Sequence, residues 1–113
     1  MAAGSPSVKP SVSRDVKYYN TGVKLMMEKM FSRAEDQFRK ILSRNERFAQ
    51  AHNNLAFTLR KQGPNHYAEA LHHYNRATEL KPQLAEPYMH RGVLHTQTGN
   101  KKLAMNDHGK LTA

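Results

Sequence analysis

The sequence of 113 residues contains no cysteine and no tryptophan, so it can form neither a disulfide nor a cysteine-ligated metal site. It has no apolar run approaching the roughly 18 residues that a membrane-spanning helix needs. It also has no apolar N-terminal stretch typical of a secretory signal. Glycine and proline are ordinary in number, which argues against a collagen-like chain. The compartment stays open, with the cytoplasm as the default expectation.

Acidic residues are scarce. Nine of them stand against 18 lysines and arginines, which gives a net charge of +9 with neutral histidines. An excess of this size is compatible with binding to nucleic acid, to an anionic membrane or to an acidic protein, and also with solubility alone.

The first 14 residues contain no acid and are dominated by small residues, serine and proline, so we predict a flexible tail over residues 1–14. From Asp15 onward, apolar residues keep a helical period between short turn signals. Asp15 and Ser32 are predicted N-caps, and Glu35 would complete a capping box with Ser32. No segment shows the alternation of a strand. The sequence therefore predicts six antiparallel helices in an all-α fold, the later ones ending at Gly63-Pro64, Lys81-Pro82 and Gly99-Asn100.

A pair of helices recurs with a period near 34 residues. Each first helix has a small residue where two helices would approach closely. Each second helix has an early alanine followed four residues later by a ring. These equivalent residues are Gly22, Ala56 and Gly92, then Ala34, Ala70 and Ala104, and then Phe38, Tyr74 and His108.

This pattern resembles the tetratricopeptide repeat (TPR) family, most closely in the second unit with Leu55-Ala56, Ala70, Tyr74, Ala77 and Pro82. The resemblance implies an α-solenoid of three helix-turn-helix repeats over residues 15–113. The units are 15–48, 49–84 with a two-residue insertion at Pro64–Asn65, and a truncated 85–113. No separate capping helix follows. We therefore expect either a fragment of a longer chain or self-association through the uncapped C-terminal end.

In this family the first helices line a concave groove that commonly binds a peptide or helix of another protein. The groove residues that the resemblance implies mix apolar anchors with amides that can bond a peptide backbone. The predicted function is a non-catalytic interaction or scaffold module without a cofactor, and the positive charge biases it toward an acidic protein partner. These residues are Tyr19, Val23, Met27, Asn53, Asn54, Phe57, Lys61, Glu86, Met89, His90, Val93 and Gln97.

One subgroup of the family grips a C-terminal carboxylate with two lysines, two asparagines and one arginine. Of those five positions only Asn54 matches here, and the others hold Tyr19, Val23, Glu86 and His90. An acid where a base is required argues against that activity.

Nothing in the sequence assembles a catalytic centre. The carboxylates are spread among basic residues as on solvated helix faces, and no glycine-rich phosphate loop occurs. The seven histidines include no pair at the i, i+4 spacing typical of zinc on one helix. We expect no enzyme and no metal site, with His52 and His108 in place of packing aromatics and the other histidines exposed.

The alternative function is anion binding by a basic stripe on the convex side, which would contact nucleic acid or a membrane surface. Aromatic residues for base stacking are not interleaved with these basic residues, so both partners are disfavoured. On an ideal helix the stripe consists of Arg33, Lys40, Arg44 and Arg47.

Overall fold

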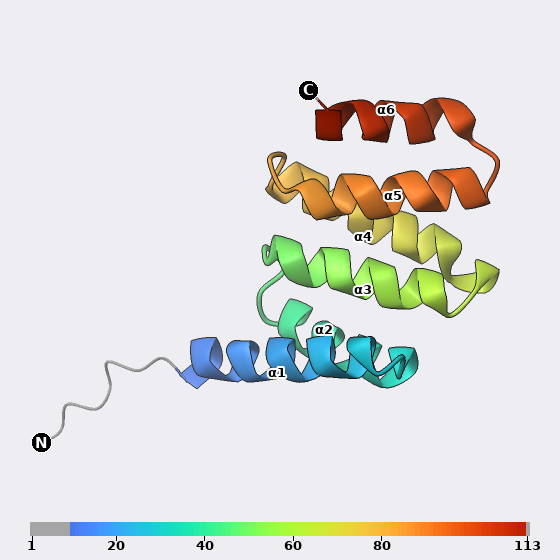
Figure 1. Ribbon diagram of the computed structural model, residues 1–113. Helices are drawn as coiled ribbons and strands as arrows, with labels where there is room; N and C mark the ends of the chain where they lie inside the picture. Colours follow the sequence, from blue (N-terminus) through green and yellow to red (C-terminus); the bar gives the residue numbers. More distant parts are fainter. Residues whose placement is uncertain (1–9, 113) are drawn as a thin grey trace, which may run out of the picture.

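The computed structural model describes residues 10–112, and that part of the chain forms six α-helices and one 3₁₀ turn. Consecutive helices pack antiparallel in chain order, with α1 and α6 at opposite ends of the stack (Figure 1). The all-α helical-repeat fold is therefore confirmed. The elements are α1 (Pro10–Met27), α2 (Phe31–Leu42), α3 (Ala49–Lys61), η2 (Pro64–His66), α4 (Tyr67–Leu80), α5 (Ala85–Gln97) and α6 (Lys101–Thr112).

The predicted beginning of the first helix at Asp15 is wrong. Helix α1 begins at Pro10, whose fixed φ and missing N–H suit a first helical turn. Asp15 is instead a buried residue in the middle of the helix, where its carboxylate accepts a hydrogen bond from Arg44 in the turn that follows α2. Residues 1–9 of the predicted tail lie outside the described residues.

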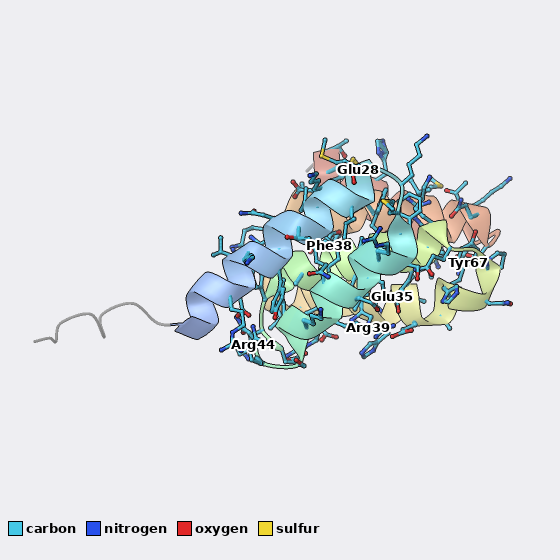
Figure 2. The ribbon with its side chains drawn as sticks, turned by 90° about the horizontal axis from the view of Figure 1, so that it is seen from below. Glu28, Glu35, Phe38, Arg39, Arg44 and Tyr67 are labelled. Atoms are coloured by element: carbon cyan, nitrogen blue, oxygen red, sulfur yellow. The ribbon has the colours of Figure 1, made fainter. Side chains whose placement is uncertain are left out.

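The predicted capping box at Ser32 is also wrong. Helix α2 begins one residue earlier, after Met30, and no side chain caps it. Glu35 accepts hydrogen bonds from Arg39 Nε at 2.7 Å and from Gln62 Nε2 at 2.8 Å. This carboxylate therefore links α2 to the end of α3, with Arg39 beside it (Figure 2).

The core repeats from one helix pair to the next. Phe38 and Ile41 of the first pair have no exposed surface, and the equivalent Tyr74 and Ala77 of the second pair are equally buried. The next helix along the chain covers them in each case. Gly22 permits this packing, because a Cβ placed there would lie 2.7 Å from the Phe38 ring.

The third helix pair differs because no helix follows it in the described residues. His108 is exposed, so the expectation that it replaces a packing aromatic is wrong for this ring. The same expectation holds for His52, which is 3% exposed. His95, expected at the surface, is 8% exposed, because it lies beside Asp107 at the junction of α5 and α6.

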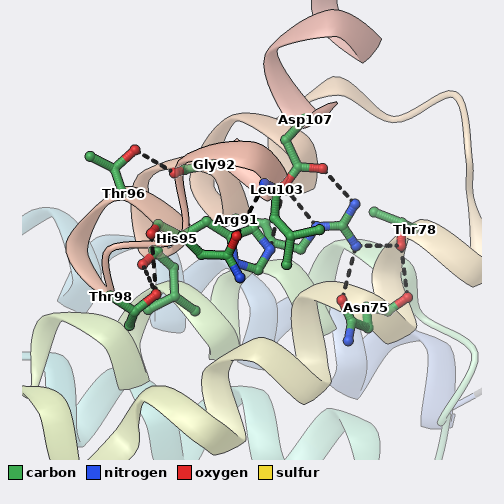
Figure 3. Close-up of polar contacts among 11 residues, drawn as sticks. Asn75, Thr78, Arg91, Gly92, His95, Thr96, Thr98, Leu103 and Asp107 are labelled. Atoms are coloured by element: carbon green, nitrogen blue, oxygen red, sulfur yellow. Dashed lines mark hydrogen bonds and ion pairs between the residues drawn. The ribbon is translucent and has the colours of Figure 1, made fainter. Parts of the chain in front are cut away.

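A buried ion pair holds α6 against α5. Both carboxylate oxygens of Asp107 accept from Arg91, at 2.9 Å from Nε and 2.7 Å from Nη2. Arg91 Nη1 also donates to Asn75 Oδ1 and Thr78 Oγ1 of α4 (Figure 3). One guanidinium therefore connects the last three helices.

We predict that Gly22→Ala destabilises the fold by about 1–3 kcal/mol, because the added methyl overlaps the buried Phe38 ring. Gly109→Ala is the matched control. It lies in α6 with no neighbour within 4 Å of the added Cβ, and alanine favours a helix by about 1 kcal/mol. Urea unfolding measures both; equal effects of the two substitutions would contradict this packing.

We predict that Asp107→Asn lowers stability by about 3 kcal/mol or more, because it leaves a largely buried arginine without its counter-charge. Asn106→Ala changes the exposed neighbouring residue and is expected to alter stability by less than about 0.5 kcal/mol. Hydrogen exchange should show the loss first in α6. Protection of α6 that is unchanged in Asp107→Asn would contradict the anchoring role.

Candidate functional site

The first helices of the three pairs, α1, α3 and α5, lie side by side along one face of the stack (Figure 1). A cavity of about 230 Å³ opens between them. It brings together Tyr19, Asn53 and Asn54 with Glu86, as the resemblance implied. Its complete lining is Tyr19, Gln50, Asn53, Asn54, Leu84 and Glu86, of which Gln50 and Leu84 were not predicted.

Side-chain amides form most of the polar lining of this cavity. Asn53 is 5% exposed, and its Nδ2 donates to Asn54 Oδ1 at 3.2 Å. The Oδ1 of Asn53 has no partner within the described residues. Glu86 adds an exposed carboxylate at the rim. No lysine or arginine lines this cavity, so it does not favour a carboxylate ligand.

A second cluster centres on Phe57, which lies edge-on to Phe31 at 6.2 Å and to His90 at 5.1 Å between ring centroids. The Lys61 ammonium lies 5.9 Å from the Phe57 centroid, and the Arg60 guanidinium lies 5.3 Å from it. Cations at this range are attracted to an aromatic face. The structure therefore joins three predicted residues to two that were missed.

Burial and the charge of Arg60 favour the neutral form of the histidine in this cluster. Burial lowers the pKa of His90, and the nearby positive charge of Arg60 lowers it further. Arg60 Nη1 also donates to Gln97 Oε1 at 3.3 Å, so the predicted residue Gln97 connects to the cluster.

The remaining predicted groove residues lie elsewhere. Met89 and Val93 line a separate cavity of about 390 Å³ at the α5–α6 end of the stack, which Gln97 also borders. Val23 packs partly against the core, and Met27 is 77% exposed. The residues predicted to form one groove thus divide between an amide cavity, an aromatic cluster and an apolar end.

The predicted basic stripe is not continuous. Helix α2 ends at Leu42, so Arg44 and Arg47 lie in the following turn and do not continue its face. Arg44 pairs with Asp15, and only Arg33 and Lys40 are exposed on the helix itself. Nearby cations are paired as well: Arg39 with Glu35 and Glu69, and Arg76 with Glu46.

Two histidines meet between α3 and α4. His52 Nε2 donates to the Glu46 carbonyl at 2.6 Å, and its Nδ1 lies 2.9 Å from His73 Nδ1. Burial lowers the pKa of both rings, that of His73 to about 4. Within residues 10–112 no three histidine or acidic side chains are placed to hold a metal ion together.

We predict that stability falls as the pH decreases from 7.5 to 5. The unfolded chain takes up protons near pH 6.5, whereas in the folded protein the pKa of His73 is lowered to about 4 and that of His52 is lowered as well, so the unfolded state binds more protons in this window. Each such proton contributes roughly 1.4 kcal/mol per pH unit. His73→Phe keeps a ring beside His52 and should flatten the dependence in urea unfolding. A variant with the wild-type slope would contradict the role of the pair.

Comparison with known proteins agrees with the repeat pattern. Residues 65–99 match the family model of the TPR repeat. None of the curated proteins compared with the sequence is significantly similar to it. The resemblance to the TPR family is confirmed by this match together with the structural similarities, and the chain has the fold of TPR proteins.

Several solved structures superpose well on this chain at low sequence identity. The second TPR of Spaghetti (RPAP3), bound to an HSP90 peptide, is 18% identical with a TM-score of 0.81, over 93% of this chain and 97% of that one. The chaperone SycD of Yersinia enterocolitica is 12% identical with a TM-score of 0.80, over 87% and 73%. A MamA double mutant is 16% identical with a TM-score of 0.79. The similarity covers 87% of this chain but only 54% of the MamA chain.

The described helices also bear on membrane insertion. Within residues 10–112 no helix combines the length and apolarity needed to cross a bilayer.

Proposed function

We propose that this protein is a non-catalytic interaction module that binds a peptide or helix of another protein across α1, α3 and α5. The observation that carries the proposal is the half-buried Phe57 ring, held between Phe31 and His90 and flanked by two cations. A ring fixed in this way can anchor an apolar side chain at little entropic cost. The cations beside it would attract an acidic residue next to that side chain.

The amide cavity supplies the second half of the recognition. The side chains of Asn53, Asn54 and Gln50 can exchange hydrogen bonds with a peptide backbone, and the unpartnered Oδ1 of Asn53 would accept a backbone N–H. The ligand would therefore lie across α3, with its backbone over the amides and an apolar side chain against Phe57. This mode suits an adaptor or scaffold role.

Two related structures support a protein ligand. The second TPR of RPAP3 was solved with an HSP90 peptide of sequence SRMEEVD, and another similar structure is the CopN–Scc3 complex. The peptide ligand in this protein would differ in its end group, because Glu86 would repel a terminal carboxylate at the rim of the amide cavity.

We predict that Phe57→Ala abolishes capture of the partner, because truncation of a central aromatic anchor typically costs 2 kcal/mol or more, about a thirtyfold loss of affinity. The measurement is affinity capture from cell extract with wild-type and variant protein side by side, with captured proteins quantified by mass spectrometry. Circular dichroism would establish that the variant is folded.

The double substitution Arg33→Glu with Lys40→Glu is the control for the convex side. Both residues are exposed, and neither takes part in an ion pair within the described residues, so the fold should tolerate the change. Partners retained by this variant and lost by Phe57→Ala support binding at α1, α3 and α5. Loss on the convex variant alone, together with salt-sensitive retention on heparin, would favour anion binding instead.

A further inference from the structure

The last helix pair exposes residues that the first two pairs bury. The positions of Phe38 and Tyr74 correspond to His108, and those of Ile41 and Ala77 correspond to Leu111. All four counterparts in the first two pairs have zero exposure, whereas Leu111 is 40% exposed. In each earlier pair the covering element is the next helix, α3 or α5.

Further apolar side chains lie at the same end of the molecule. Met89 is 47% exposed and Val93 is 42% exposed on α5, while Met105 of α6 is 73% exposed. Met105 corresponds to Leu71, which the following helix half-covers. Between α5 and α6 is the cavity of about 390 Å³, with Gly92 and Ala104 in its lining beside Met89, Val93, His108 and Leu111.

The opposite end of the stack is polar. The residues of α3 that pack against the preceding pair are Ala51, Leu55 and Thr58, all at most 1% exposed. Their counterparts in α1 are the exposed Lys17, Thr21 and Lys24. Head-to-tail stacking of two copies would therefore bury two lysines against an apolar cavity, which is unfavourable. The first helix of a second copy is not a suitable cover.

The charge of α6 distinguishes between the other candidates that could pack on this end of the molecule. Lys101, Lys102 and Lys110 are exposed, and none of them takes part in an ion pair within the described residues. The single acid of the helix, Asp107, is buried against Arg91. Two copies that meet face to face would bring these lysines together, and each copy has a net charge of +9. An acidic helix would meet complementary charge instead.

We propose that the α5–α6 end binds an amphipathic helix of another protein, which has small and medium apolar residues at i, i+4, i+7 and i+8 and acidic residues on its outward flanks. This is the spacing of the α3 residues that are buried where the second helix pair follows the first, namely Ala51, Leu55, Thr58 and Leu59. This site is separate from the Phe57 cluster, although Met89 and Val93 were predicted for the groove. The test therefore uses substitutions on α6.

The probe is a fluorescein-labelled 15-residue peptide that keeps the Ala51, Leu55, Thr58 and Leu59 side chains at their own spacing, with glutamate at the outward positions. The control peptide has the same sequence with lysine in place of each of these glutamates. Fluorescence anisotropy with the full chain should show binding of the acidic peptide. The lysine peptide should bind at least about tenfold more weakly at low salt, and the difference should shrink in 0.5 M salt.

Leu111→Gln should weaken binding of the acidic peptide about tenfold, because it removes an apolar contact of roughly 1.5 kcal/mol. Leu103→Gln is the matched control. Leu103 lies on the same helix and is 41% exposed, close to the 40% of Leu111, but it lines the cavities on the α4 side. It should change the affinity less than twofold. Thermal unfolding of both variants would verify that α6 remains folded.

Five outcomes would overturn the proposal, and the first four concern the peptides, the leucine variants and the oligomeric state. These are no binding of the acidic peptide, equal binding of the lysine peptide, equal effects of the two leucine substitutions, and a concentration-dependent dimer in sedimentation that Leu111→Gln dissociates. The last result would identify a second copy as the cover. Peptide binding lost on Phe57→Ala but not on Leu111→Gln would place the peptide at the Phe57 cluster, which overturns this inference and leaves the proposed function standing.

Discussion

A pair of short antiparallel helices cannot bury its own apolar face, and the whole structure follows from that constraint. Phe38 becomes inaccessible only because Gly22 lets α2 approach α1 on one side while α3 covers the ring on the other. Tyr74 is buried in the same way between its own pair and α5. Each pair is therefore stable only as a neighbour of another pair, and the last one has to be held differently.

The last pair is held by charge. Arg91 stands where the second pair has Leu55, and its guanidinium joins Asp107 of α6 to Asn75 and Thr78 of α4. A bidentate arginine–carboxylate pair is directional and needs no covering layer on its far side. The helix can thus remain in place while its outward surface stays apolar and open to a partner.

Local signals predicted the helix ends well and the helix beginnings poorly. Gly63-Pro64 and Lys81-Pro82 end helices because proline cannot continue them and glycine accepts a positive φ, here 113° at Gly63. Asp15 and Ser32 looked like caps, yet tertiary contacts decide both cases. Arg44 draws Asp15 into the interior, and the Phe31 ring begins α2 because it packs on Phe57.

In the candidate site, only the residues whose positions follow from the alignment of the repeats could be predicted. The register places Tyr19, Asn53 and Asn54 on facing helices, and they do line one cavity. Nothing in the register indicates that Arg60 becomes buried, because arginine is ordinarily exposed and its hydrogen-bond partner Gln97 comes from α5. The basic stripe failed for a related reason, since an ideal helical wheel continues past the residue where α2 ends.

The unlike ends give the stack a direction. Lysines and a threonine occupy the outer surface of α1 where the inner helices have buried contacts, so a helix added before α1 would have to pack against two lysines. A helix added after α6 would find an apolar surface ready. A further helix, whether of the same chain or of another protein, would therefore be accommodated at the α5–α6 end and opposed at the outer face of α1.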